Sequence, residues 1–269
     1  MKCDGISYKP NSENKIKKNA CLAFTAIPRA NYKLTGENCI GTVFQLEKND
    51  IDYLKYIRSK IYNIFERFNI NNESCKQVIT EAFDASIELL DNRNENKSKI
   101  LMAFAGNEPC GILIGNALKT DKFNNLHYSS RKNAAKHETE LDWLATWNKN
   151  VKGVGKILVN EFFHTLKKDG FKSVYVRSEV PEKSCAVKFY EKMGFRTISE
   201  KQRLIQRKND NGYKIGQFDS PDDYILPMKA SKKNIEETIK NRSIELDRRE
   251  IPFFSENDLC LKLERAKLE

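Results

Sequence analysis

The sequence predicts a mixed α/β fold with a central sheet flanked by helices, and two observations lead to this prediction. Between residues 37 and 230, segments that alternate in hydrophobicity are interspersed with segments whose apolar residues recur every three or four positions. After an initial pair of helices, strand-like and helix-like segments alternate along the chain, which is typical of a sheet covered by helices.

The periodicity places these elements in a definite order. A strand is expected at 39–46, helices at 51–68 and from 75, strands at 99–105, 110–118 and 140–147, a helix at 154–168, a strand at 171–178, a short helix at 184–192, and strands at 195–205 and 223–228. The polar stretch 119–137 has a length at which loops are usually functional or mobile.

The two ends of the chain differ from this middle region. Residues 1–36 are rich in Lys, Asn and Ser without any period, so we expect this polar N-terminal segment to be mostly disordered. Residues 231–269 interleave basic and acidic residues with thinly spaced apolar ones, which predicts a charged, solvated helical tail outside the core. The sequence therefore predicts a domain at 37–230 between two extensions.

Composition excludes several classes of protein. With 39% apolar residues among 269, the chain is too apolar to be wholly disordered. Its longest apolar run, residues 100–105, is far shorter than the ~20 residues of a membrane-spanning helix, and we expect no membrane span and no secretory signal peptide. The formal net charge of +10 favours anionic partners, although a solvated Lys-rich surface explains it equally well.

The cysteine and histidine residues indicate a reducing, cytoplasmic environment and no metal site. The chain has seven Cys, none in a C-x-x-C pair, and three His that are far apart in sequence. This distribution supports neither a disulfide framework nor a zinc site.

A glycine-containing loop is the first feature that indicates chemistry. It joins a strand that ends near Trp147 to a helix that begins near Val154, and it contains Gly153 and Gly155. A helix amino end has unpaired backbone N–H groups and a positive dipole end, and glycine lets a ligand approach that backbone. The loop is therefore either a phosphate or pyrophosphate cradle or simply a tight turn. Three lysines would add positive charge beside it: Lys149, Lys152 and Lys156.

The second feature is the segment 186–195, which opens a short helix, contains Phe189 and Tyr190, and closes with Gly194. A tyrosine in this position is by itself more often a core residue than a catalyst. Together, Lys152-Gly-Val-Gly-Lys156 and Phe189-Tyr-Glu-Lys-Met-Gly-Phe195 resemble the GCN5-related N-acetyltransferase (GNAT) family. The resemblance is strongest over 138–196 and extends loosely over 37–230, and Asn150 stands where the family usually has Gln or Arg.

This resemblance implies a GNAT-type sheet and an acetyl-CoA-dependent N-acetyltransferase. The acetyl group would pass to a primary amine of a protein or small molecule by direct attack in a ternary complex. Acetyl-CoA, as co-substrate and without any metal, would lie where strands 140–147 and 171–178 splay apart. The implied cofactor-binding residues are Leu144, Ala145 and Thr146 for the pantetheine arm, and Asn150, Val151, Lys152, Gly153, Val154, Gly155 and Lys156 for the pyrophosphate.

The resemblance also implies two catalytic residues. Tyr190 matches the tyrosine that protonates the departing thiolate in many members, and a phenol with a pKa near 10 can serve as that acid. Glu140 is the expected base, with Glu138 and Asp142 as alternatives, although a solvent-facing Glu140 is equally consistent with the pattern. Strand alternation predicts Glu140 and Asp142 on one face, and it predicts residues 141 and 143 on the other.

Two other readings of the sequence remain open. The basic excess would also suit a non-catalytic interaction or nucleic-acid-binding module on the same fold, although no nucleic-acid motif is present. The polar N-terminal segment would suit a secreted bacterial effector that acetylates host proteins, although an ordinary disordered terminus explains it more simply. For an enzyme, the net charge disfavours polycationic substrates.

Overall fold

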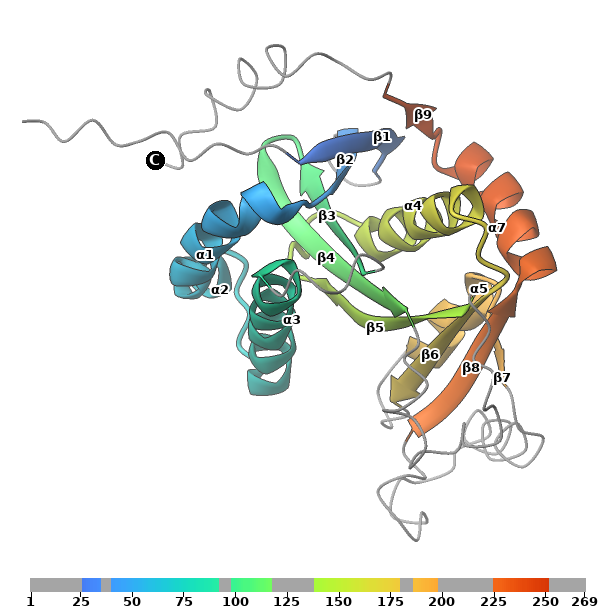
Figure 1. Ribbon diagram of the computed structural model, residues 1–269. Helices are drawn as coiled ribbons and strands as arrows, with labels where there is room; N and C mark the ends of the chain where they lie inside the picture. The colour runs from blue at the N-terminus through green and yellow to red at the C-terminus, as the bar shows by residue number, and fades with distance from the viewer. Residues whose placement is uncertain are drawn as a thin grey trace, which may run out of the picture.

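The computed structural model describes residues 26–34, 40–91, 98–117, 138–179, 186–197 and 225–251, with a nine-stranded sheet at the centre (Figure 1). The strands are β1 (Ile27–Lys33), β2 (Ile40–Gln45), β3 (Lys99–Ala105), β4 (Glu108–Ala117), β5 (Glu138–Thr146), β6 (Ser173–Glu179), β7 (Arg196–Thr197), β8 (Ile225–Ser231) and β9 (Arg249–Glu250). Their order across the sheet is β7-β8-β6-β5-β4-β3-β2-β1-β9. Among these strands, β5 and β6 form the parallel pair, and the other neighbours are antiparallel.

Helices cover both faces of the sheet, each over its own apolar core (Figure 1). The helices are α1 (Ile51–Ser59), α2 (Ile61–Arg67), α3 (Glu73–Asp91), α4 (Val154–Lys168), α5 (Ala186–Lys192) and α7 (Lys232–Glu245), with a 3-10 turn, η1, at Lys48–Asp50. The first three pack on one face, and α4, α5 and α7 pack on the other. The predicted fold class, a mixed sheet flanked by helices, is confirmed.

The predicted elements agree best where the pattern is strongly periodic. The helix at 154–168 and the strand at 99–105 have the predicted limits. The helix expected at 51–68 is instead two helices, because the backbone leaves the helical conformation at Lys60. The polar stretch 119–137 and most of the strand expected at 195–205 lie outside the described residues.

The prediction that residues 1–36 are mostly disordered is wrong for the part that forms β1. This strand pairs with β2 on one side and with β9 on the other, and it buries Ala30 and Tyr32. One of its two partners comes from the far end of the chain, so local sequence could not reveal that pairing. Residues 1–25 lie outside the described residues.

The prediction of a solvated C-terminal tail outside the core is wrong for α7. This helix follows β8 directly and buries Ile235 and Ile239 in the core shared with α4. Much of its packing is polar: the Asn234 side chain donates to the Gly194 carbonyl at 2.8 Å, and the Thr238 hydroxyl donates to the Met193 carbonyl at 3.3 Å. Because polar side chains make these contacts, the apolar spacing underestimates how closely the helix packs.

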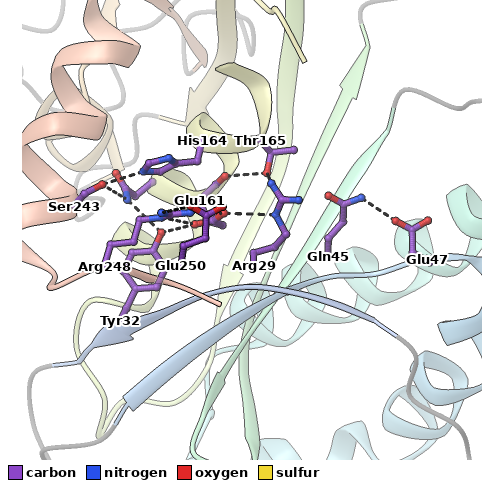
Figure 2. A network of polar contacts seen from close by, with 11 residues as sticks. Arg29, Tyr32, Gln45, Glu47, Glu161, His164, Thr165, Ser243, Arg248 and Glu250 are labelled. Atoms are coloured by element: carbon purple, nitrogen blue, oxygen red, sulfur yellow. Dashed lines mark hydrogen bonds and ion pairs between the residues drawn. The ribbon is translucent and has the colours of Figure 1, made fainter. Parts of the chain in front are cut away.

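A buried carboxylate on α4 ties the two ends of the described chain together (Figure 2). Glu161 is fully buried. Its carboxylate accepts a hydrogen bond from the Tyr32 hydroxyl at 2.7 Å and another from Arg248 Nε at 2.9 Å, and Arg29 Nε lies 3.5 Å away. Tyr32 and Arg29 belong to β1, and Arg248 follows α7, so one side chain connects three distant segments.

We predict that Glu161→Gln lowers the free energy of unfolding by about 3–5 kcal/mol, because it leaves the half-buried Arg29 and Arg248 without their buried counter-charge. Urea denaturation measures this change. The matched control is Arg249→Gln, which removes an exposed ion pair with Asp247 and is expected to leave the free energy of unfolding nearly unchanged. Equal, small effects of the two substitutions would show that the buried carboxylate does not hold the chain ends.

Candidate active site

The parallel pairing between β5 and β6 is short and ends in a fork. Glu138–Leu141 lies opposite Ser173–Val176, and beyond this point β5 pairs only with β4 among the described strands. The register on β4 shifts at the same place, because Ile114 lies opposite Trp143 and Gly115 lies opposite Leu141. Asp142 is therefore an extra residue, a β-bulge, which bends the strand and increases its twist. Past the bulge, one edge of β5 thus has no partner among the described strands.

The bulge also changes which side chains share a face. Leu141 and Leu144 contact the core under α4, whereas Trp143 and Ala145 contact the core under α1–α3. The prediction that residues 141 and 143 share a face is therefore wrong. Simple alternation counts every residue, and the extra residue at Asp142 shifts the count by one.

The amino end of α4 is built as an open cradle. Gly153 is the N-cap with φ +96°, a left-handed conformation that favours glycine, and this residue has no side chain with which to cap the helix. The first bond of the helix runs from the Ile157 N–H to the Gly153 carbonyl at 3.0 Å. The preceding N–H groups, those of residues 154–156, have no acceptor within the helix. They can therefore bind an anion.

In the loop before α4, some of the predicted cofactor-binding groups form hydrogen bonds with other residues of the chain. The Asn150 N–H donates to the Asn148 side chain at 3.1 Å, and the Val151 N–H donates to the Asn148 carbonyl at 3.4 Å. Two of the expected lysines have defined partners: Lys149 donates to the Asn69 carbonyl at 3.0 Å, and Lys156 pairs with Glu245 at 2.9 Å, while Lys152 is not free either. The backbone of α4 is thus better placed than these side chains to hold a phosphate.

Helix α5 closes against this cradle. A Cβ atom added to Gly155 would lie 3.3 Å from the Phe189 ring and 3.9 Å from the Leu144 side chain. The absence of a side chain at Gly155 therefore brings β5, α4 and α5 together beside the fork. Tyr190, the next residue of α5, is 9% exposed and packs edge-on against Phe189, with ring centroids 5.2 Å apart. Burial raises the pKa of the Tyr190 phenol, so it keeps its proton at neutral pH.

Glu140 lies on the other face of the sheet from Tyr190. Its neighbour Leu141 is in the core that contains Tyr190, so alternation directs Glu140 to the opposite side. Glu140 is 2% exposed; its Oε1 accepts a hydrogen bond from Arg177 Nε at 2.8 Å, and its buried Oε2 has no partner among the described residues. Burial, and then the charge of Asp142, raise the pKa of Glu140 to about 7, against the opposing effect of Arg177.

Glu138, the first alternative base, has a different environment. Its Oε1 accepts hydrogen bonds from Ser173 at 2.9 Å, Tyr175 at 3.1 Å and Lys229 at 3.2 Å. Partial burial acts to raise the pKa of Glu138, but these donors outweigh it and the pKa is lowered. Glu138 is therefore less suited to accept a proton near neutral pH than Glu140.

Among the predicted residues, Gly155 and Leu144 lie close to each other beside Phe189 of α5, whereas Glu140 and Tyr190 lie on opposite faces of the sheet. The structure also adds a residue that the sequence did not single out, Arg177, which bonds to Glu140. Tyr175 lies opposite Glu140, and Arg177 is two residues further along β6, so strand alternation puts Arg177 on the face of Tyr175 and Glu140. The sequence could have indicated this only if the parallel pairing had been known. Among the described residues, no group of three or more His, Cys, Asp or Glu could hold a metal ion. In the same part of the chain, no helix combines the length and apolar character that crossing a membrane requires.

Comparison with known proteins agrees with this architecture. The model of the Acetyltransferase (GNAT) family matches residues 59–195, just over half of the chain. The chain therefore belongs to this family of acetyltransferases, which confirms the resemblance seen in the sequence. A search of the curated proteins found no match.

Solved structures of low sequence identity are similar to this chain. An uncharacterized protein from Bacillus halodurans has a TM-score of 0.50 and 12% identity, over 81% of this chain and 97% of that chain. A putative acetyltransferase of the GNAT family from Desulfovibrio desulfuricans has a TM-score of 0.45 and 14% identity, over 71% of this chain and 99% of that chain. The PaiA N-acetyltransferase from Thermoplasma acidophilum, in complex with coenzyme A, has a TM-score of 0.38 and 16% identity, over 71% of this chain and 98% of that chain.

Proposed function

We propose that the chain is an N-acetyltransferase that uses acetyl-CoA as co-substrate and acetylates a primary amine of a protein or small molecule by direct attack. The observation that carries this proposal is the fork between β5 and β6. There the edge of β5 that no described strand covers lies near the open amino end of α4, and Phe189 of α5, the neighbour of Tyr190, lies beside them. Family membership supports the same reaction class.

The residues at the fork fit a thioester of coenzyme A. The backbone of Leu144, Ala145 and Thr146 lies past the bulge, where β5 has no second strand partner among the described residues, so its polar groups can pair with the amides of a pantetheine arm. The N–H groups of residues 154–156 and the positive dipole end of α4 suit a pyrophosphate. Bound there, acetyl-CoA supplies an acetyl group activated as a thioester.

Proton movements are assigned to Glu140 and Tyr190. Glu140 Oε2 accepts the proton of the amine as the nitrogen–carbon bond forms, and the Tyr190 hydroxyl donates a proton to the sulfur as the carbon–sulfur bond breaks. A backbone N–H of β5 past the bulge stabilises the charge that develops on the acetyl oxygen. Because Glu140 and Tyr190 lie on opposite faces, the amine approaches from the side of α1–α3 and the coenzyme from the side of α4.

We predict that Gly153→Glu weakens acetyl-CoA binding more than tenfold, about 1.4 kcal/mol, because a carboxylate at the N-cap repels a pyrophosphate. Isothermal titration calorimetry measures the affinity. Gly170→Glu is the matched control: this residue also has a positive φ, at the other end of α4, and a Cβ there meets nothing within 4 Å. The Gly170→Glu protein should bind acetyl-CoA with the affinity of the wild type. If the wild type does not bind acetyl-CoA, the chain is a non-catalytic interaction module on this fold.

We predict that the wild-type rate rises with pH through about 7, because Glu140 accepts a proton only when ionised and its pKa is about 7. Glu140→Gln should remove this rise and lower kcat by about a hundredfold. The assay follows free thiol released from acetyl-CoA with a panel of primary amines, including peptides. Glu138→Gln should keep the rise in rate with pH. If Glu138→Gln abolishes this rise and Glu140→Gln does not, Glu138 is the base.

We predict that Tyr190→Phe lowers kcat by at least about tenfold and leaves the affinity for acetyl-CoA unchanged, because only the proton donor is removed. Steady-state kinetics and calorimetry together separate these effects. Tyr62→Phe, an exposed tyrosine on α2, is the control. An unchanged kcat in Tyr190→Phe would mean that the thiolate leaves without this acid.

A further inference from the structure

Arg177 occupies the point at which the two parallel strands separate. Leu141 and Val176 form the last pair in the β5–β6 register, and Arg177 is the next residue of β6. Its Nε donates to Glu140 Oε1 at 2.8 Å while 38% of its own side chain is exposed. A side-chain bond therefore bridges the two strands just where their parallel register ends.

This bond leaves the two oxygens of Glu140 unequal. Oε1 is held by Arg177, whereas Oε2 is buried and has no hydrogen-bond partner among the described residues. A buried carboxylate oxygen without a partner is costly, so such atoms are rare unless a ligand or water completes them. The carboxylate is thus held in one orientation, with a single oxygen left to accept a proton.

The charges around Glu140 belong to two separate groups. Asp142 on the same strand and Arg177 on β6 act directly on Glu140. On the same face, Lys229 of β8 bonds to Glu138 Oε1 and to the Tyr175 hydroxyl, at 3.2 and 2.8 Å. The cation that bonds to Glu140 in the described part of the chain is therefore Arg177, and Lys229 offers a matched comparison.

We propose that Arg177 is a positioning residue, which holds Glu140 across the fork so that Oε2 alone faces the incoming amine and takes its proton. This inference rests on the proposed function and adds to it a residue that need not touch either substrate. It requires that loss of the guanidinium change how Glu140 titrates without changing how the coenzyme binds. An opposite charge at hydrogen-bond distance favours the ionised form of a carboxyl group.

The test compares Arg177→Gln, Arg177→Lys and Lys229→Gln with the wild type. In Arg177→Gln, the midpoint of the rise in rate with pH should move up by about one unit, and kcat should fall about tenfold. The KM for acetyl-CoA should not change. Arg177→Lys should recover part of the shift, because it restores the charge without the planar geometry. Lys229→Gln should keep the wild-type midpoint.

A second readout needs no amine substrate. NMR titration of protein labelled at the glutamate carboxyl carbons, with the signal assigned by Glu140→Gln, should show the same upward shift in Arg177→Gln. An unshifted titration in a folded Arg177→Gln protein, or loss of acetyl-CoA binding in that variant, overturns the positioning role. If instead Glu140→Gln retains the wild-type rate and pH dependence, Glu140 is not the base and the proposed function fails at that residue.

Discussion

The short parallel pairing of β5 with β6 is the constraint on which the rest of the site depends. Because the register ends at Leu141 and Val176 and the bulge at Asp142 follows at once, β5 continues with one edge that no described strand covers. A longer pairing would close this edge and bury the main-chain groups that a coenzyme needs. A strand without the bulge would also direct Trp143 away from the core under α1–α3.

Helix α4 links the stability of the fold to the chemistry of the site. Its middle carries Glu161, which holds β1 and the segment after α7 through buried hydrogen bonds and ion pairs. Its amino end supplies the N–H groups of the cradle, and Gly155 allows α5 to approach. An element fixed this firmly can present its helix end in one orientation. A preorganised site of this kind needs no reordering when a ligand binds.

In its proposed role as the base, Glu140 would combine a cost in stability with a gain in reactivity. A buried carboxylate with one unpartnered oxygen destabilises the folded state, and the same burial raises its pKa to the range in which a base works at neutral pH. Arg177 reduces this cost and leaves the second oxygen for the proposed reaction, since it bonds to only one of the two oxygens. Glu138, two residues earlier on the strand, accepts three hydrogen bonds, and its pKa is lowered rather than raised.

The sequence by itself determined the elements and motifs that depend on neighbouring residues. These are the helix at 154–168, the strand at 99–105, and the two glycines at the amino end of that helix. The family resemblance also follows from such local motifs. Only the tertiary structure decided the bulge at Asp142, the strand β1 and the burial of α7. It also decided that Lys156 pairs with Glu245, and that Arg177 bonds to Glu140. Periodicity and backbone preference act over a few residues, whereas strand register and buried charge pairs join residues far apart in the chain, so no local pattern encodes them.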